Sequence, residues 1–199
     1  MVLKGVTGVV LAGGLATRMG GVDKGLQPLG GKTLVAHVLE RLAPQVGRVL
    51  INANRNLPDY AAFGYPVVSD QVAGFAGPLA GLHAALLAAE TPWVVTAPCD
   101  VPYLPTDLVA RLMAAAEQAK APVAIASAGG RVHPVFCLCR RDLVSDLADY
   151  LAVGERKVML WVERHGCVPV PFDAMPEAFL NINSPDLLVQ ATVPGVSTP

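Results

Sequence analysis

This chain of 199 residues has no long apolar run and no excess of one charge. It also lacks the two cysteine pairs that a four-cysteine zinc site would need. A membrane-spanning helix needs about 18 continuous apolar residues, whereas the longest apolar runs, residues 78–89 and 109–119, are short and interrupted. The amino terminus lacks the charged and apolar blocks of a signal peptide. Net charge is −1 and Lys and Arg are scattered, so no basic field favours nucleic acid. These absences predict a cytoplasmic protein that binds neither membranes nor nucleic acids.

Cysteine usage argues against a zinc site. Cys137 and Cys139 form a C-x-C pair in a predicted strand, where alternation places both thiols on one face. Cys99 and Cys167 stand alone, so no second pair has ligand spacing. We therefore expect the two thiols of the pair to pack as small hydrophobic groups.

The composition is that of a folded α/β protein, with 53% hydrophobic and 16% charged residues. Short apolar runs alternate with helical patterns, which predicts a three-layer, Rossmann-like fold with a mainly parallel sheet. We expect a single domain over residues 1–192 and a frayed tail over residues 193–199. The expected strands are residues 7–12, 48–53, 66–69, 93–97, 123–127, 135–139 and 167–170. The expected helices are residues 33–42, 79–89, 106–120, 141–151 and 185–190, with Thr106 as the N-cap of the third.

The most informative segment is the loop that follows the first expected strand. It contains four glycines and two cations: Gly13, Gly14, Gly20, Gly21, Arg18 and Lys24. Glycine lets backbone amides approach a phosphate closely, and Arg and Lys neutralise an anion held there. The loop therefore predicts a polyphosphate site.

Two familiar phosphate motifs do not fit this loop. A dinucleotide-binding loop needs Gly-x-Gly-x-x-Gly and an acidic residue at the end of the second strand, but Gly14 directly follows Gly13 and the second strand ends near Asn52. A Walker A loop would need a glycine at Leu26. We interpret Lys32 and Thr33 as a helix start instead.

Polar residues follow the other expected parallel strands. Asn52 ends the second strand, Asp70 follows the third and Asp100 follows the fourth. Ligands of open parallel sheets bind beyond these carboxyl ends, so one cleft should collect them all. A lone carboxylate facing a triphosphate is typical of Mg²⁺ binding, and we predict Asp100 as the Mg²⁺ ligand.

The loop also resembles the signature of nucleotidyltransferases that add a nucleotide to a phosphorylated acceptor. More narrowly, it is similar to that of the molybdenum cofactor guanylyltransferase family. Five later blocks occur in that family's order and spacing, so the resemblance covers nearly the whole chain. These blocks are residues 51–55 (INANR), 77–81 (GPLAG), 98–103 (PCDVPY), 154–158 (GERKV) and 181–185 (NINSP).

The resemblance implies an enzyme that transfers GMP from GTP to the terminal phosphate of molybdopterin and releases pyrophosphate. The amino-terminal half would bind the nucleotide and the other half the acceptor. Arg18, Lys24 and Asp100 would be catalytic. The nucleotide would contact ten positions: Leu11, Ala12, Gly13, Gly14, Lys24, Asn52, Asp70, Pro78, Gly81 and Asp100.

The acceptor side has less specific motifs. His133 is a candidate contact for the second substrate, and Arg156 with Lys157 forms a candidate site for the pterin phosphate. Asn181 and Asn183 lie on alternate residues and so share one side. Many relatives have a second metal-binding carboxylate near this segment, whereas this chain has Asn183. A second carboxylate ligand from this segment is therefore in doubt.

Three alternative functions remain open. CTP could replace GTP, although the blocks around residues 11–12 and 78–81 favour GTP. A sugar phosphate could be the acceptor of another nucleotide. A non-catalytic GTP-binding protein that delivers the cofactor is the third, and retention of Arg18, Lys24 and Asp100 argues against it. A cofactor carrier or target apo-enzymes are the expected protein partners.

Overall fold

The structure is a computed structural model, and it describes residues 2–14, 23–72 and 77–182. Its centre is a seven-stranded sheet with the order β5-β4-β1-β6-β8-β7-β9. All neighbours pair in parallel except β8, which runs antiparallel to both β6 and β7. The mainly parallel sheet that the sequence predicts is therefore confirmed. The strands are β1 (Leu3–Leu11), β4 (Val46–Asn52), β5 (Val67–Val68), β6 (Trp93–Pro98), β7 (Val123–Ala128), β8 (Arg131–Arg140) and β9 (Val168–Pro171).

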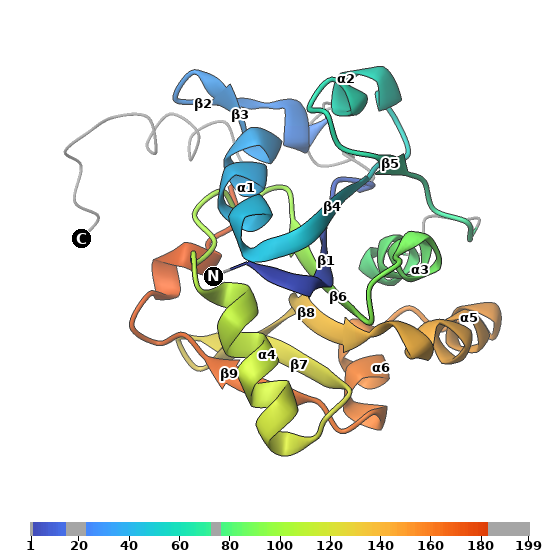
Figure 1. Cartoon of the computed structure of the whole chain (residues 1–199). Helices are drawn as coiled ribbons and strands as arrows, with labels where there is room; N and C mark the ends of the chain where they lie inside the picture. Colours follow the sequence, from blue (N-terminus) through green and yellow to red (C-terminus); the bar gives the residue numbers. More distant parts are fainter. Residues whose placement is uncertain (1, 15–22, 73–76, 183–199) are drawn as a thin grey trace.

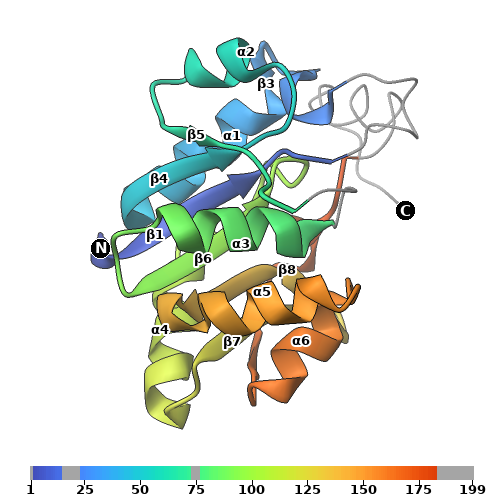
Figure 2. The ribbon, with the colours of Figure 1, turned by 90° about the vertical axis from the view of Figure 1, so that its right-hand side faces the viewer.

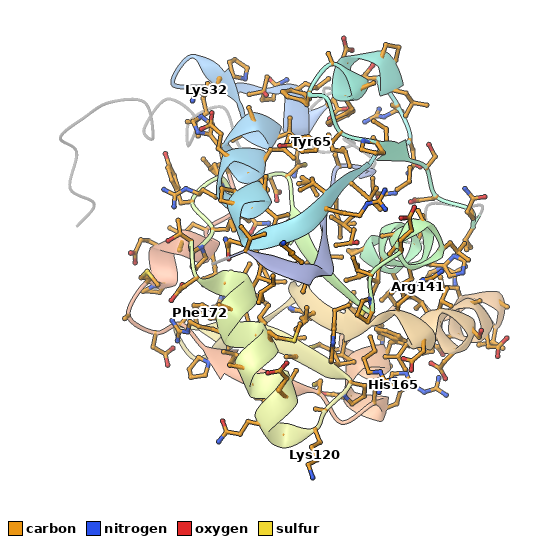
Figure 3. The ribbon with its side chains drawn as sticks, in the orientation of Figure 1. Lys32, Tyr65, Lys120, Arg141, His165 and Phe172 are labelled. Carbon is orange, nitrogen blue, oxygen red and sulfur yellow. The ribbon has the colours of Figure 1, made fainter. Side chains whose placement is uncertain are left out.

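Helices cover both faces of the sheet and give three layers (Figures 1 and 2). One face carries α1 (Leu34–Leu42) and α4 (Leu108–Ala119). The other carries α3 (Pro78–Ala88), α5 (Val144–Ala152) and α6 (Val158–Arg164). Each face has its own apolar core, and Phe172, fully buried and labelled in Figure 3, belongs to the α1–α4 side.

Local sequence explains why these elements begin where they do. Thr33 caps α1, because its Oγ1 accepts a hydrogen bond from the Ala36 amide over 3.4 Å. This confirms the interpretation of Lys32 and Thr33 as a helix start. Helix α3 begins at Pro78, the position where a missing N–H costs nothing, and it is buried along most of its length. The thiols of Cys137 and Cys139 are free and lie in the core beneath α3 and α6.

Several expected boundaries are wrong by a few residues. Helix α4 begins at Leu108 with Asp107, not Thr106, in the N-cap position. The expected helix 141–151 is a 3₁₀ turn, Arg141–Leu143, followed by α5, and β8 begins four residues earlier than expected. The sequence interpretation missed α6, the short helix α2 (Leu57–Ala61) and the hairpin of β2 (Pro28–Leu29) with β3 (Lys32–Thr33).

The expected carboxy-terminal elements and the expected absence of a membrane span need separate mention. The expected helix 185–190 and the tail 193–199 belong to the part of the chain that the structure does not describe. Among the described helices, none combines the length and the apolar character that crossing a bilayer requires.

Candidate active site

The carboxyl ends of the parallel strands meet at one edge of the sheet. Beyond the paired strands, the Ala12 amide donates to the Asn52 carbonyl over 2.8 Å, and the Cys99 amide donates to the Leu11 carbonyl over 3.0 Å. The end of β1 is thus held between the ends of β4 and β6. In Figure 2 this edge lies on the right, where α3 also begins. The parallel strand ends thus share one edge of the sheet, as the sequence indicates, and the cleft expected there stays a prediction.

Asp70 joins two asparagines that follow or end β4. Its Oδ1 accepts from Asn52 Nδ2 over 2.9 Å, and its Oδ2 accepts from Asn54 Nδ2 over 2.8 Å. The Asp70 amide in turn donates to Asn54 Oδ1 over 2.9 Å. Both carboxylate oxygens therefore already have a protein partner. The structure brings Asn52 and Asp70 together as predicted, and it adds Asn54, to which the sequence interpretation assigned no role.

The glycine loop is tied to this network through its carbonyl groups. Asn54 Nδ2 also donates to the Gly13 carbonyl over 3.2 Å, and Arg55 Nη2 donates to the Gly14 carbonyl over 3.4 Å. In a trans peptide the N–H points opposite to the preceding C=O, and the described chain has no cis peptide. The Gly14 amide therefore points away from Asn54, and it has no acceptor among the described residues.

Close packing also requires glycine at two predicted nucleotide-binding positions. A Cβ on Gly13 would lie 2.8 Å from Asn54 Nδ2 and 3.0 Å from Asn52 Oδ1. A Cβ on Gly81, in the first turn of α3, would overlap Asn52 Oδ1 and lie 2.8 Å from Leu11 Cδ2. Gly81 thus lets α3 approach the end of β4. Gly14, by contrast, has open space around it.

Asp100 and Lys24 face each other beyond the end of β6. Lys24 Nζ lies 3.7 Å from Asp100 Oδ2, and the same oxygen accepts from Asn181 Nδ2 over 3.4 Å. Asp100 is 9% exposed. Burial raises the pKa of its carboxyl, while the Lys24 charge acts in the opposite direction. Among the described residues Lys24 is the cation paired with Asp100, and a buried carboxylate with one such partner can accept further positive charge.

A second buried carboxylate, Asp23, precedes Lys24. Its Oδ1 accepts from the Tyr60 hydroxyl over 2.5 Å and from the Gly25 amide over 3.2 Å, and its Oδ2 accepts from Asn56 Nδ2 over 3.0 Å. The sequence did not predict these partners. The one signal in the sequence was that Asp23 directly precedes Lys24.

The candidate acceptor residues fall into two groups. His133 stacks on Phe179 with ring centroids 4.9 Å apart, and Asn181 lies two residues further along, on Asp100. Burial lowers the pKa of His133. Arg156 lies in the loop between α5 and α6, where its Nη1 donates to the carbonyls of Leu151 and Glu155 over 2.8 and 2.7 Å. The described contacts thus connect His133 and Asn181 with the Asp100 side, and anchor Arg156 to α5.

Four predicted residues lie outside the described ranges: Arg18, Gly20, Gly21 and Asn183. In the described part of the chain, no three His, Cys, Asp or Glu side chains cluster closely enough to hold a metal by themselves. One carboxylate together with phosphate oxygens and waters is nevertheless a usual Mg²⁺ site, and Asp100 fits that arrangement.

Comparison with known proteins agrees with this geometry. Residues 8–168 match the model of the MobA-like NTP transferase domain. A molybdenum cofactor guanylyltransferase from Cupriavidus metallidurans is 53% identical over 188 residues, which cover 92% of each chain.

Solved structures share the fold. Molybdopterin-guanine dinucleotide biosynthesis protein A from Archaeoglobus fulgidus superposes with a TM-score of 0.76 at 26% identity, over 94% of this chain and 96% of that one. A 2-C-methyl-D-erythritol 4-phosphate cytidylyltransferase from Thermus thermophilus has a TM-score of 0.66 at 21% identity, over 92% and 96% of the two chains. The chain belongs to the molybdenum cofactor guanylyltransferases, a family of nucleotidyltransferases with a MobA-like NTP transferase domain.

Proposed function

We propose that this protein transfers GMP from GTP to the terminal phosphate of molybdopterin, with pyrophosphate as the second product. The observation that supports this most strongly is the Lys24–Asp100 pair, which lies at the strand edge that also carries the Gly13–Gly14 loop. The pair provides a cation for phosphate oxygens and a buried carboxylate for a metal ion.

In the proposed reaction an oxygen of the molybdopterin phosphate attacks the α-phosphorus of GTP in line. A new P–O bond forms, the bond to the β-phosphate bridging oxygen breaks, and pyrophosphate leaves with that electron pair. The attacking phosphate has a second pKa of about 6 and is largely ionised at neutral pH, so it needs no strong general base. Catalysis then depends on positioning and on charge neutralisation.

Each part of the site has a proposed task in this reaction. The Gly14 amide and Lys24 bind the triphosphate, and Arg18 of the undescribed loop segment adds a bidentate cation. Asp100 would hold Mg²⁺, which when bound neutralises charge on the phosphate oxygens. Lys24 stabilises the charge that develops on the departing pyrophosphate.

Nucleotide recognition is proposed for the network around Asp70. Asn52 and Asp70 would hold the guanine and ribose with the backbone of Leu11 and Ala12, while the first turn of α3, with Pro78 and Gly81, completes that side. Since Asp70 already accepts one amide at each oxygen, contacts to the base use the remaining lone pair of each oxygen.

The acceptor would bind on the other side of Asp100. His133 and Asn181, with Asn183 beyond the described residues, would contact the pterin. Arg156 with Lys157 would form a second anion site for its phosphate. Transfer of the product to a carrier or an apo-enzyme and a cytoplasmic location stay predictions.

The test is pyrophosphate release by the purified protein with molybdopterin, Mg²⁺ and each of GTP, CTP, ATP and UTP. We expect release with GTP and a product with the mass of molybdopterin guanine dinucleotide. Preference for CTP would indicate a cytidylyltransferase. In a parallel set of reactions a sugar phosphate replaces molybdopterin, and turnover only in that set would indicate a different acceptor. GTP binding without pyrophosphate release would indicate a non-catalytic delivery protein.

A further inference from the structure

The Asp23 carboxylate is enclosed by three hydrogen-bond donors. Tyr60 from α2 and the Gly25 amide donate to one oxygen, and the side chain of Asn56, the residue before α2, donates to the other. The Asp23 carbonyl also accepts from Gln27 Nε2 over 3.2 Å. Only 9% of Asp23 is exposed, and burial of a carboxylate is costly unless it is hydrogen-bonded. The enclosed carboxylate therefore joins the start of the Lys24–Leu26 turn to α2.

Tyr60 is suited to a permanent donor role. Its side chain is fully buried, and burial raises the pKa of its hydroxyl well above the usual range, so the proton stays on the oxygen. A Cβ on Gly25 would lie 2.5 Å from that oxygen and 3.4 Å from Cys99 Sγ. The backbone of the turn is thus pressed between the tyrosine hydroxyl and the residue that precedes Asp100.

The Lys24 side chain extends from this turn toward Asp100, with Nζ 3.7 Å from Oδ2. The lysine stem is long and flexible, so movement of the backbone at its root would add to the movement of the stem and spread the ammonium group over more positions.

We propose that Asp23, held by Tyr60 and Asn56, is a positioning residue that fixes Lys24 opposite Asp100. The inference rests on the proposed function, because it takes Lys24 to be the cation that serves the triphosphate. It assigns a role to the side chains of Asp23 and of Asn56, the residue before α2, and neither is among the groups proposed to touch the substrates. Loss of one donor to Asp23 should loosen the turn without removing any group from the site.

The variants are Tyr60→Phe, which removes one donor, and Asn56→Gly, which removes the other. Asn56 has a φ of 49° and is exposed, and glycine adopts this backbone conformation without strain. Asn56→Gly should therefore fold, and it keeps the test valid even where Tyr60→Phe fails to fold. Tyr65→Phe is the matched control, because Tyr65 (labelled in Figure 3) follows Tyr60 closely in the chain, packs against the same core and is not one of the three donors to Asp23.

The first readout is kcat/KM for GTP in a double-mutant cycle with Lys24→Ala. In the native background we expect Tyr60→Phe or Asn56→Gly to lower it about tenfold, the effect of one hydrogen bond to a charged group. In the Lys24→Ala background we expect less than a twofold further loss. An equal loss in both backgrounds, or none in the native one, would overturn the inference. An inactive wild type, or an unaffected Lys24→Ala, would instead contradict the proposed function.

A second readout does not depend on activity. The rate of acetylation of Lys24, measured by mass spectrometry against exposed Lys32 in the same molecule, reports how firmly Lys24 is held. We expect the Lys24/Lys32 ratio to rise at least threefold in Tyr60→Phe and Asn56→Gly and to stay constant in Tyr65→Phe. An unchanged ratio in both test variants would contradict the positioning role.

Discussion

Asn181 Nδ2 donates a hydrogen bond to Asp100 Oδ2 over 3.4 Å. The neighbouring Ile182 amide donates to the Asp100 carbonyl over 2.8 Å, so the carboxy-terminal segment is attached to the end of β6 by both side chain and backbone. Residues 81 positions apart in the chain thereby share one site. The proposed metal ligand is oriented by the segment that also carries Phe179, on which His133 stacks.

Asn181→Ala should reduce activity more than stability. The substitution removes a neutral donor that orients Asp100, while Asp100 keeps Lys24 and the Ile182 contact. We expect kcat/KM for GTP to fall about three- to tenfold, the cost of an ordinary hydrogen bond, because this bond is long at 3.4 Å. The change in unfolding free energy should be less than about 1 kcal/mol. Gln118→Ala, at an exposed position of α4, is the control. Unchanged kinetics would show that Asp100 does not need this partner.

Asp70→Asn should damage both the network and nucleotide binding. The new amide group faces the Nδ2 donor of Asn52 or of Asn54, and a buried donor without an acceptor costs about 1–3 kcal/mol. We expect that loss in urea unfolding and at least a tenfold weaker GTP affinity by calorimetry. Asp59→Asn, exposed on α2, should change neither. Normal GTP affinity in Asp70→Asn would remove Asp70 from the nucleotide site.

Gly81→Ala tests whether the approach of α3 to Asn52 matters. In an exposed helix this change would stabilise the protein by about 1 kcal/mol through helix propensity. Here the added Cβ would overlap Asn52 Oδ1, and overpacking costs about 1–3 kcal/mol. We therefore expect net destabilisation and weaker GTP binding, measured by denaturant unfolding and calorimetry. Gly5→Ala, whose added Cβ would be 3.8 Å from Pro92, is the control. A stabilised Gly81→Ala would refute the packing argument.

The hydrogen bonds to Asp146, a residue outside the proposed site, lead us to expect that the stability of the fold depends on pH. Partial burial would raise the pKa of its carboxyl, but hydrogen bonds from His165 (Figure 3) and Trp161 outweigh burial and hold it below 3.8. A carboxyl with a lowered pKa stabilises the fold above the unfolded-state pKa and loses that contribution as the pH falls through the folded-state pKa.

The expected result is a wild type more stable than Asp146→Asn by about 1 kcal/mol at pH 7, since Asp146 is a third exposed and its ion pairs are screened. The difference should shrink as the pH falls below 3.8. Thermal unfolding of both proteins from pH 7 to pH 2.5 measures it, with Asp142→Asn as a surface control. A difference that stays constant over this range would contradict the argument.

The sequence predicted those features that depend on local pattern. Apolar runs and turn residues predicted the sheet and its strand ends, and hence the shared edge of Asn52, Asp70 and Asp100. It could not predict the partners of Asp23 or Asp70, because those hydrogen bonds join segments 16 to 37 residues apart and leave no periodic signal. Short elements were missed for a similar reason: α2 has five residues, too few for a helical period to show.

The glycines of the loop after β1 are needed for two different physical reasons. Gly13 was interpreted as a phosphate cradle, and the structure adds that its missing side chain makes room for Asn52 and Asn54. Gly14 has no such neighbour, so its role rests on its amide. The sequence could not separate these two reasons, because both require the same residue.

The most direct test of the central claim is pyrophosphate release from GTP and molybdopterin, measured with melting temperature for wild type, Lys24→Ala and Lys32→Ala. Lys32 is the matched lysine, since it pairs with Glu40 on the surface over 2.5 Å. We expect Lys24→Ala to lose at least a hundredfold in turnover, the scale of one lost charge-stabilising group, at an almost unchanged melting temperature. Lys32→Ala should keep wild-type turnover. A Lys24→Ala variant as active as the Lys32→Ala control would show that Lys24 does not serve the triphosphate.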